Sequence, residues 1–226
     1  MPVEATIRTW RPQRFGRRAA RHIDDPLIEP LWPGIRVLGH ARPDGAEFVD
    51  TEGGTQLWPD VSQGLAAALT ADSAILDGYL TPEPQDAGFG PIAGIEEEPP
   101  ARTLGRQLFW FGDERRRRER EALREAERPR AIEPDETIVF MAVDLLELDG
   151  QQLLDVPLLE RKRLLDAVVE DGPLARRGMH IRPPIGTWIS TWRALGFRAI
   201  AYKSANSRYR PGEPNDDWAT APLPIR

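Results

Sequence analysis

The chain has 226 residues, 40% of them hydrophobic, which is enough for one large domain or one and a half small ones with a real core. Its formal net charge of −6 argues against a general polyanion binder, and its seven Trp argue against disorder. The absence of cysteine excludes disulfides and thiolate sites and fits a cytoplasmic protein. No apolar stretch approaches the length of a membrane span, and the N-terminus lacks the apolar region of a secretory signal.

Lysine is nearly absent among the basic residues of the chain. Lys162 and Lys203 are the only lysines among 30 basic residues, and the rest are arginines. A bias in genome composition explains this preference without any function. The chemical consequence holds either way, because a mechanism that needs a lysine amine has only these two residues to use.

The sequence divides into a basic N-terminal arm, residues 1–23, and one domain, residues 24–226. The arm carries six arginines interleaved with two aromatic residues: Arg8, Arg11, Arg14, Arg17, Arg18, Arg21, Trp10 and Phe15. Such a segment suits contact with nucleic-acid phosphates while its aromatic rings stack on bases. The alternatives are a solvated arm and an arm that packs on its own domain.

Residues 34–58 are predicted to form short strands joined by turns, one of them at Asp44-Gly45. A short helix follows through Leu65–Leu69. The apolar run Ala74–Leu76 is too short for a helix and predicts a buried strand. This strand is expected to end in a turn at Asp77-Gly78, because Asp-Gly is a common turn dipeptide.

Residues 81–136 are predicted to be an insertion made of a loop and a charged helix. Five prolines and several glycines between residues 81 and 100 indicate the loop. Residues 113–128 are expected to be helical, with opposite charges four residues apart, as in Arg117 and Glu121. The arginines at 115–118 suit a phosphate grip, but the glutamates that follow favour a solvated helix face.

The second half of the chain returns to regular structure. The apolar run Ile138–Val143 predicts a central strand, and Asp149-Gly150 predicts a turn. Asp155 is expected to cap a helix that has Pro157 in its first turn. The remaining elements are a short strand, a helix that stops at a glycine, a last strand and a turn, at residues 179–181, 185–195, 197–203 and 209–212. This order predicts a mixed α+β fold with several antiparallel strands.

Several stretches, in their order and spacing, resemble the nucleotidyltransferase (adenylation) domain of bacterial ATP-dependent DNA ligases. They are Arg42-Pro43-Asp44-Gly45, Ala74–Leu80, Val143–Arg161 and Gly196–Trp218, the last including Tyr209-Arg210-Pro211-Gly212. The resemblance implies an ATP-grasp-like α+β adenylation domain with antiparallel sheets and packed helices. Because few residues follow Trp218, no OB-fold domain is expected.

The first motif of that family is Lys-x-Asp-Gly-x-Arg, and its lysine attacks the α-phosphate of ATP to carry AMP to a DNA 5′-phosphate. In this resemblance Arg42 stands at the lysine position. A lysine works because burial and neighbouring charge can lower its pKa enough to expose a lone pair, whereas a guanidinium keeps its proton. Arg42 therefore suits phosphate binding and not nucleophilic attack.

Further departures fall on other positions that the family uses. Glu47 replaces the second basic residue of the first motif, Tyr79 a glutamate, Val143 the ring that stacks on adenine, and Arg198 the metal-associated glutamate. The closing motif at Trp218–Pro222 lacks both of its lysines. Lys203 and the Asp-Gly pairs are kept. The resemblance thus implies a retained fold with neither a catalytic residue nor a metal ligand.

The leading interpretation is a non-catalytic pseudoenzyme that binds a nucleotide, a DNA end or a DNA-repair protein. ATP or AMP would be held without a covalent bond by five residues: Arg42, Asp44, Gly45, Asp77 and Lys203. The loss of the glutamate puts Mg²⁺ binding in doubt. Two alternatives stay open, an atypical active nucleotidyltransferase that uses Lys203 and a structural interaction protein without a nucleotide site.

Overall fold

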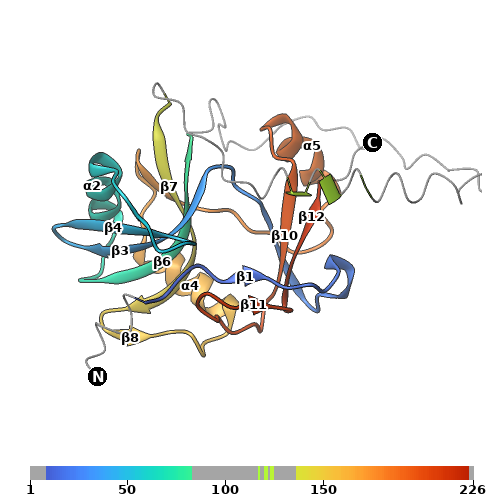
Figure 1. Ribbon diagram of the computed structural model, residues 1–226, viewed down its shortest axis with the longest axis horizontal. Coiled ribbons are helices and arrows are strands. Elements are labelled where there is room, and N and C mark those ends of the chain that lie inside the picture. Colours follow the sequence, from blue (N-terminus) through green and yellow to red (C-terminus); the bar gives the residue numbers. More distant parts are fainter. Residues whose placement is uncertain (1–8, 83–116, 118–119, 122, 125–135, 224–226) are drawn as a thin grey trace, which may run out of the picture.

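The strands form one large sheet, one small sheet and a separate strand pair (Figure 1). The computed structural model describes residues 9–82, 117, 120–121, 123–124 and 136–223. The seven-stranded sheet follows the order β5 (Thr55–Gln56), β4 (Gly45–Asp50), β3 (Ile35–Arg42), β6 (Ala74–Pro82), β7 (Ile138–Leu148) and β8 (Gln151–Gln152), with β9 (Ala175–Arg177) parallel to β7. The three-stranded sheet follows the order β12 (Trp218–Pro222), β10 (Ala199–Ser204) and β2 (Pro26–Pro30).

Helices and a short parallel strand pair complete the described fold. The pair consists of β1 (Arg14–Phe15) and β11 (Pro214–Asn215). The helical elements are η1 (Ala20–His22), α2 (Pro59–Ala68), α4 (Leu158–Val168) and α5 (Gly186–Ala194). Apart from β9, the strands of the two sheets pair in antiparallel fashion, which is the predicted mixed α+β class.

Strand β7 is apolar along most of its length because both of its faces are buried. Phe140 packs on one face of the seven-stranded sheet and Met141 on the other. A strand that is buried on both faces lacks the polar alternation of a surface strand. The strand predicted at 138–143 is confirmed, and it continues to Leu148 before the predicted turn at Asp149-Gly150.

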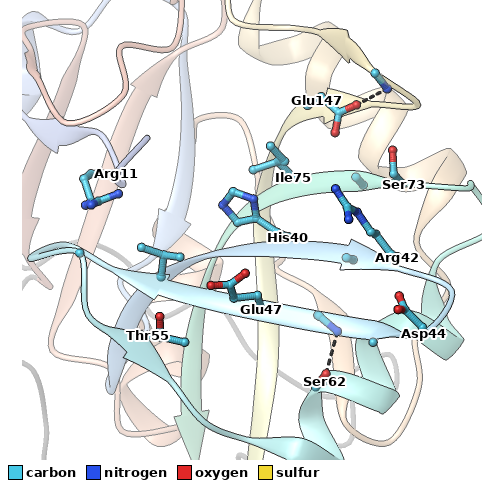
Figure 2. A pocket seen from close by; sticks show the side chains of 17 residues that line it. Arg11, His40, Arg42, Asp44, Glu47, Thr55, Ser62, Ser73, Ile75 and Glu147 are labelled. Carbon is cyan, nitrogen blue, oxygen red and sulfur yellow. Dashed lines mark hydrogen bonds between the residues drawn. The ribbon is translucent and has the colours of Figure 1, made fainter. Parts of the chain in front are cut away.

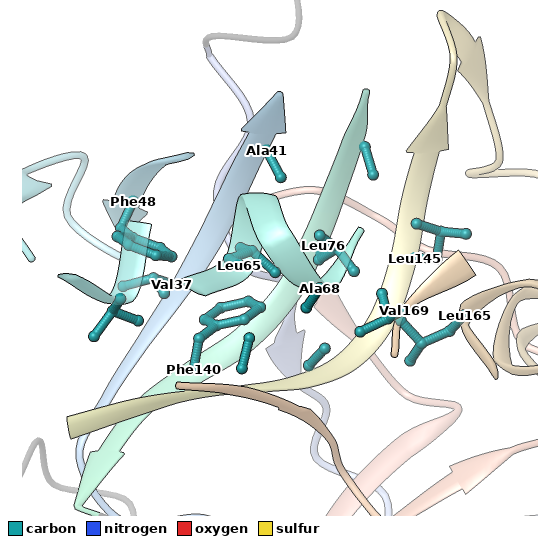
Figure 3. Packing of buried hydrophobic residues seen from close by; sticks show 14 of the residues in the cluster. Val37, Ala41, Phe48, Leu65, Ala68, Leu76, Phe140, Leu145, Leu165 and Val169 are labelled. Atoms are coloured by element: carbon teal, nitrogen blue, oxygen red, sulfur yellow. The ribbon is translucent and has the colours of Figure 1, made fainter. Parts of the chain in front are cut away.

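Helix α2 covers one face of the large sheet, and the small sheet packs against the other. Figure 3 shows Leu65 and Ala68 of α2 facing Leu76 and Phe140 of the sheet. On the opposite face, residues of β6 and β7 share two further buried clusters with β2, β10 and β12. Any site between the two sheets is therefore bordered by these two clusters.

The turn predicted at Asp77-Gly78 is wrong, because β6 continues through both residues to Pro82. The Asp77 carboxylate is fully buried, and it accepts hydrogen bonds from the Arg36 guanidinium and the Tyr209 hydroxyl. Partners from distant parts of the chain thus satisfy a group that would otherwise favour a turn or solvent. The register of β6 against β7 shifts at this point.

Gly78 is required at its position by the packing of β7. A Cβ atom there would lie 2.5 Å from Phe140 Cζ and 2.6 Å from the Met141 carbonyl oxygen. We expect Gly78→Ala to lower the free energy of unfolding by about 1 to 3 kcal/mol through overpacking. Chemical denaturation measures this, with Gly186→Ala as the matched control, since nothing lies within 4 Å of a Cβ at Gly186. Equal stability of the two variants would contradict the packing argument.

The helix cap predicted at Asp155 is also wrong, since Pro157 is the N-cap residue of α4 and no side chain caps the helix. The main-chain N–H of Leu158 donates instead to the carbonyl oxygen of Ser207 at 3.0 Å. The first N–H groups of a helix need acceptors from outside it. Here a loop from the C-terminal part of the chain supplies one, so no local cap is needed.

The short strand predicted at 179–181 is wrong as well. Within this range only Ile181 forms a β-bridge, with Ile28, and the actual strand β9 lies earlier in the chain. The helix predicted at 185–195 is confirmed. It ends before Gly196, whose φ of +85° is typical of a glycine that follows a helix.

Residues 9–23 pack on the rest of the fold. The Trp10 ring is buried, the Gln13 side chain is fully buried, and the Phe15 ring lies 6.0 Å from the Trp218 ring. Of the alternatives for the N-terminal arm, packing on its own domain is therefore the correct one for these residues. Trp10 and Phe15 are not presented for stacking on bases.

Five described residues of the insertion are helical: 117, 120, 121, 123 and 124. The predicted ion pair between Arg117 and Glu121 is confirmed at 3.4 Å, with both side chains mostly exposed. The loop predicted at 81–100 lies outside the described residues except for Thr81 and Pro82, which belong to β6. None of the described helices has the length and hydrophobicity needed to cross a membrane.

Candidate functional site

An open cavity of about 820 Å³ lies at the β3–β4 hairpin of the large sheet (Figure 2). Three predicted site residues line it, namely Arg42, Asp44 and Gly45. Arg42 and Gly45 are direct partners across the hairpin. The hairpin is held to α2 by the Ala46 N–H, which donates to Ser62 Oγ at 2.7 Å. This volume is in the range of small-molecule sites.

The charges around this cavity are mixed. Arg11 and Arg42 lie on different sides of it, and the carboxylates of Asp44, Glu47 and Glu147 also line it (Figure 2). Burial raises the pKa of Glu147 and outweighs the hydrogen bond from the Gly150 N–H and the charge of Arg42, which lower it. The cavity thus presents guanidinium donors for an anion together with carboxylates that oppose it.

Asp77, a fourth predicted site residue, lies outside this cavity in a buried network between the sheets. Its carboxylate accepts two hydrogen bonds from Arg36, Nε at 3.1 Å and Nη2 at 2.6 Å, and one from the Tyr209 hydroxyl at 2.8 Å. Tyr209 Oη in turn accepts from the Gln13 main-chain N–H at 2.8 Å. Every oxygen of Asp77 is therefore engaged by the protein itself.

Aromatic rings enclose the guanidinium of Arg36. Its Cζ lies 5.4 Å from the Phe15 ring centroid, 5.9 Å from that of Tyr79 and 5.8 Å from that of Trp218. These rings come from the N-terminal segment, the large sheet and the small sheet. The carboxylate and the aromatic rings therefore stabilise the charged guanidinium of Arg36 in its buried position.

Lys203, the fifth predicted site residue, is buried and bound to a carboxylate. Its Nζ donates to Glu29 Oε2 at 2.7 Å and lies 4.3 Å from the centroid of the Trp218 ring. The Nζ of Lys162 lies 2.6 Å from the other oxygen of Glu29. Glu29, Lys162 and Lys203 are each at most 2% exposed. The only two lysines of the chain thus share one buried carboxylate.

The pKa of Glu29 reflects this arrangement. Burial alone would raise it, but the charges and hydrogen bonds of Lys162 and Lys203 dominate and lower it from 4.5 to about 2. Burial also lowers the pKa of Lys203, against the attraction of Glu29. His180, which is partly buried, has its pKa lowered by burial and then by the positive charge of Lys162. We name Glu29, Lys162 and Lys203 the lysine–carboxylate triad.

A hydrophobic cluster fills the space beside the triad. It brings together Tyr79 of β6 and Val143 of β7, two positions at which the resembled family carries functional residues, and Ala199 of β10, which follows Arg198. Leu31 joins the same cluster, and its N–H donates to the Ala199 carbonyl oxygen at 3.0 Å. The cluster also contains Trp32, whose ring lies 4.9 Å from that of Phe197, edge to face. These side chains pack on each other.

Comparison with known proteins places this fold among the DNA ligases. The chain is 25% identical over 193 residues to a DNA ligase of Natronomonas pharaonis. The aligned region covers 84% of this chain and 31% of that protein. It is 27% identical over 208 residues to DNA ligase 1 of Korarchaeum cryptofilum, which covers 89% of this chain and 34% of that protein. The chain spans about a third of the length of these curated relatives. No protein-family model matches it.

Solved structures give the same result. The ligase domain of M. tuberculosis LigD matches with a TM-score of 0.58 and 19% identity, covering 93% of this chain and 58% of that one. The chain has the fold of a DNA ligase nucleotidyltransferase domain. A mycobacterial DNA ligase D complexed with ATP and MES matches this ligase-like domain with a TM-score of 0.58 and 18% identity, covering 93% of this chain and 59% of that one. The resemblance and the fold class predicted from the sequence are confirmed.

The sequence reasoning missed a second stretch with the spacing of the first ligase motif. In Leu31-Trp32-Pro33-Gly34-Ile35-Arg36, glycine and arginine stand at the fourth and sixth positions of Lys-x-Asp-Gly-x-Arg. Gly34 has a φ of +104°, and a Cβ there would lie 2.1 Å from the Leu80 carbonyl oxygen. Only glycine fits this position. The signal in the sequence for this second stretch was Arg36, two residues after Gly34. Glu47 stands at the corresponding position after Gly45.

The described residues offer little for a metal ion. Within the described ranges, no three His, Asp or Glu side chains converge as a metal site. The Arg36–Asp77 pair and the lysine–carboxylate triad are closed ion-pair networks, each buried between the sheets. Of the five predicted site residues, the structure brings Arg42, Asp44 and Gly45 together and separates them from Asp77 and Lys203.

Proposed function

We propose that this ligase-like domain does not transfer a nucleotide covalently and acts in the cytoplasm by binding, with a DNA end or a DNA-repair protein as its partner. The relatives that support a DNA-related role carry the name DNA ligase. Because the chain spans only about a third of their length, their activity is not carried over to it. The non-catalytic part of the proposal rests on the chemistry of this chain's own residues.

The observation that carries the proposal is the state of the two lysines. An attacking amine must be unprotonated and must reach the α-phosphate of ATP. Both ammonium groups lie within 2.7 Å of Glu29, and both side chains are at most 3% exposed. A buried ion pair of this kind occupies the amine and holds it away from substrate. The remaining 28 basic residues are arginines, which do not lose their proton.

We further propose that Leu31, and not Arg42, stands at the position of the ligase lysine. Three observations support this register: the Gly34 and Arg36 spacing, the positive φ of Gly34, and the contact of Leu31 with Ala199 in the hydrophobic cluster. In either register the position carries no amine. The same register puts the nucleophile position inside a cluster that apolar side chains already fill.

A nucleotide remains a candidate ligand, because one solved neighbour is a DNA ligase D complexed with ATP. For this chain we propose that ATP or AMP would bind without a covalent bond in the open cavity lined by Arg42, Asp44 and Gly45. Guanidinium groups suit phosphates, and the cavity is large enough for a nucleotide. Asp77 and Lys203 would not contribute, since their polar atoms are bound within the protein.

The decisive experiment is a search for a covalent adduct. We expect the protein, incubated with α-labelled ATP and Mg²⁺ or Mn²⁺, to carry no label after denaturing electrophoresis. Leu31→Lys and Arg42→Lys test the two registers. We expect Leu31→Lys to stay unlabelled because the cluster excludes ATP. We expect Arg42→Lys to stay unlabelled because position 42 is exposed, so that burial does not activate the new amine. An active ATP-dependent DNA ligase serves as the positive control.

Label on the wild-type protein would overturn the proposal. Its site would then be mapped by mass spectrometry, and loss of label in Lys203→Arg would favour the atypical nucleotidyltransferase. Label on Leu31→Lys alone would support the register and refute the claim that the cluster excludes ATP. A thermal shift with ATP that Arg42→Ala abolishes would support non-covalent binding in the open cavity, whereas a shift that Arg42→Ala retains would refute that location.

A further inference from the structure

Two segments far apart in the sequence form one basic surface. Residues 9–23 contain five arginines and no acidic residue. Main-chain hydrogen bonds fix this segment along residues 208–218. They run from Gly212 N to Arg11 O at 2.9 Å, from Arg14 N to Glu213 O at 2.9 Å and from Gly16 N to Trp218 O at 3.0 Å. Strand β1 runs parallel to β11 at the same place (Figure 1). The position of these arginines is therefore set by the fold.

Six arginines of these two segments are exposed, and we name them the arginine surface: Arg14, Arg17, Arg18, Arg21, Arg208 and Arg210. Three acidic residues lie among them, Glu213, Asp216 and Asp217. They neutralise the surface only in part. Asp216 Oδ1 accepts from the Arg17 main-chain N–H, and Asp217 lies 3.8 Å from Arg18 in a half-exposed ion pair. Exposed pairs of this kind contribute little and are easily exchanged for another anion.

The excess of positive charge here contrasts with the whole chain. The protein carries 36 acidic and 30 basic residues, so its net charge of −6 opposes general binding of polyanions. A polyanion can then bind only where positive charge is locally concentrated. The side chains of this surface are all arginines, whose forked donors match phosphate oxygens.

The same segments exclude recognition by stacking on bases. Trp10 is buried in the core, and Phe15 lies between Arg36 and Trp218. Arginines that contact phosphates fix a protein on the duplex but do not read its base sequence. Arg14, Arg17 and Arg21 lie in β1, in the bend that follows it and in η1, so they are spread along the segment.

We infer that the arginine surface binds the phosphate backbone of duplex DNA without sequence preference. This rests on the proposed function, in which a DNA end is a partner of the domain, and it adds the face of the molecule that makes the contact. The open cavity at Arg42 and the cluster beside the triad take no part in it. Binding of this type weakens steeply with salt, because each neutralised phosphate releases a counterion.

The test measures duplex binding by fluorescence anisotropy across a salt series from about 50 to about 200 mM, where phosphate contacts have their largest effect. The variant is Arg17→Ala/Arg208→Ala. Among the described residues, these two arginines use only main-chain atoms in hydrogen bonds, so the fold is not expected to change. We expect the double variant to bind duplex DNA about tenfold more weakly than the wild type at low salt. The slope of log affinity against log salt concentration should be smaller by about two, one for each lost phosphate contact. Duplexes of unrelated sequence should bind alike.

The matched control is Arg120→Ala/Arg124→Ala, which removes two exposed arginines from the charged helix. We expect it to bind as the wild type does. An equal loss in both double variants would refute the arginine surface and indicate a general charge effect. Wild-type binding that Arg17→Ala/Arg208→Ala leaves unchanged would refute the surface and leave the proposed function standing. No duplex binding by the wild type at low salt would refute DNA as the partner itself.

Discussion

Replacing Glu29 by glutamine is expected to lower the free energy of unfolding by about 3 to 5 kcal/mol, as for other buried ion pairs that lose one partner. Glu29 holds the ammonium groups of Lys162 and Lys203 at 2.6 and 2.7 Å, and all three side chains are buried. Glutamine keeps the shape of the side chain and removes its charge. The variant therefore leaves two positive charges close together in the protein interior. Urea denaturation of both proteins at neutral pH measures the difference.

The same triad predicts how stability depends on pH. The pKa of Glu29 is about 2 in the folded protein and near 4.5 when it is unpaired. A carboxyl group with a lowered folded pKa contributes stability above its unfolded value and loses it as pH falls toward the folded value. The wild type should therefore lose stability between about pH 4.5 and pH 2. Glu29→Gln should lack this part of the loss.

Glu160→Gln is the control for both measurements. Glu160 pairs with Arg163 at 2.6 Å, but the two side chains are 48% and 66% exposed. Removal of an exposed pair is expected to cost less than about 1 kcal/mol. A cost for Glu29→Gln as small as that for Glu160→Gln would mean that the two buried lysines do not depend on Glu29 as their counter-charge. That result would also weaken the argument that the ion pairs with Glu29 prevent either lysine from serving as a nucleophile.

Asp77→Asn is expected to cost about 3 kcal/mol or more, since it leaves the guanidinium of Arg36 without its counter-charge. Asp77 accepts two hydrogen bonds from Arg36 and one from Tyr209. The amide group of asparagine can accept on one side only and presents N–H donors on the other. The loss should appear in thermal and chemical unfolding and should be larger than that of an average point mutation.

Asp44→Asn is the matched control, because Asp44 precedes glycine just as Asp77 does. Asp44 is exposed at the β3–β4 turn, and asparagine is also a good turn residue. Its substitution should change stability by less than about 0.5 kcal/mol. If the two variants lose similar stability, the buried network around Asp77 does not stabilise the fold as expected.

Local sequence patterns predicted the parts of the fold that local forces control. The run at 138–143 was apolar enough to mark a central strand, and Gly196 marked the end of a helix. The predicted charge pair of Arg117 and Glu121 required only helical spacing. In contrast, the cap at Asp155 failed because a loop from elsewhere in the chain satisfies the helix N-terminus.

The candidate site was harder to predict than the fold. Arg42, Asp44 and Gly45 are close in sequence and do share a cavity. Asp77 and Lys203 were grouped with them through a motif, but their partners come from distant parts of the chain. The contact of Leu31 with Ala199 depends on the pairing of β2 with β10, and strand pairing over such a distance has no local signal.

The sequence by itself determined that this chain is short of lysine, belongs to the α+β class and resembles a ligase domain, because composition and ordered motifs need no coordinates. Only the tertiary structure decided what the two lysines do. Burial against Glu29 removes both amines from solvent, and that burial arises where β2, β10 and α4 meet. The environment of an ionisable group depends on neighbours that are distant in sequence, so the same residue type can be a nucleophile in one fold and a structural cation in another.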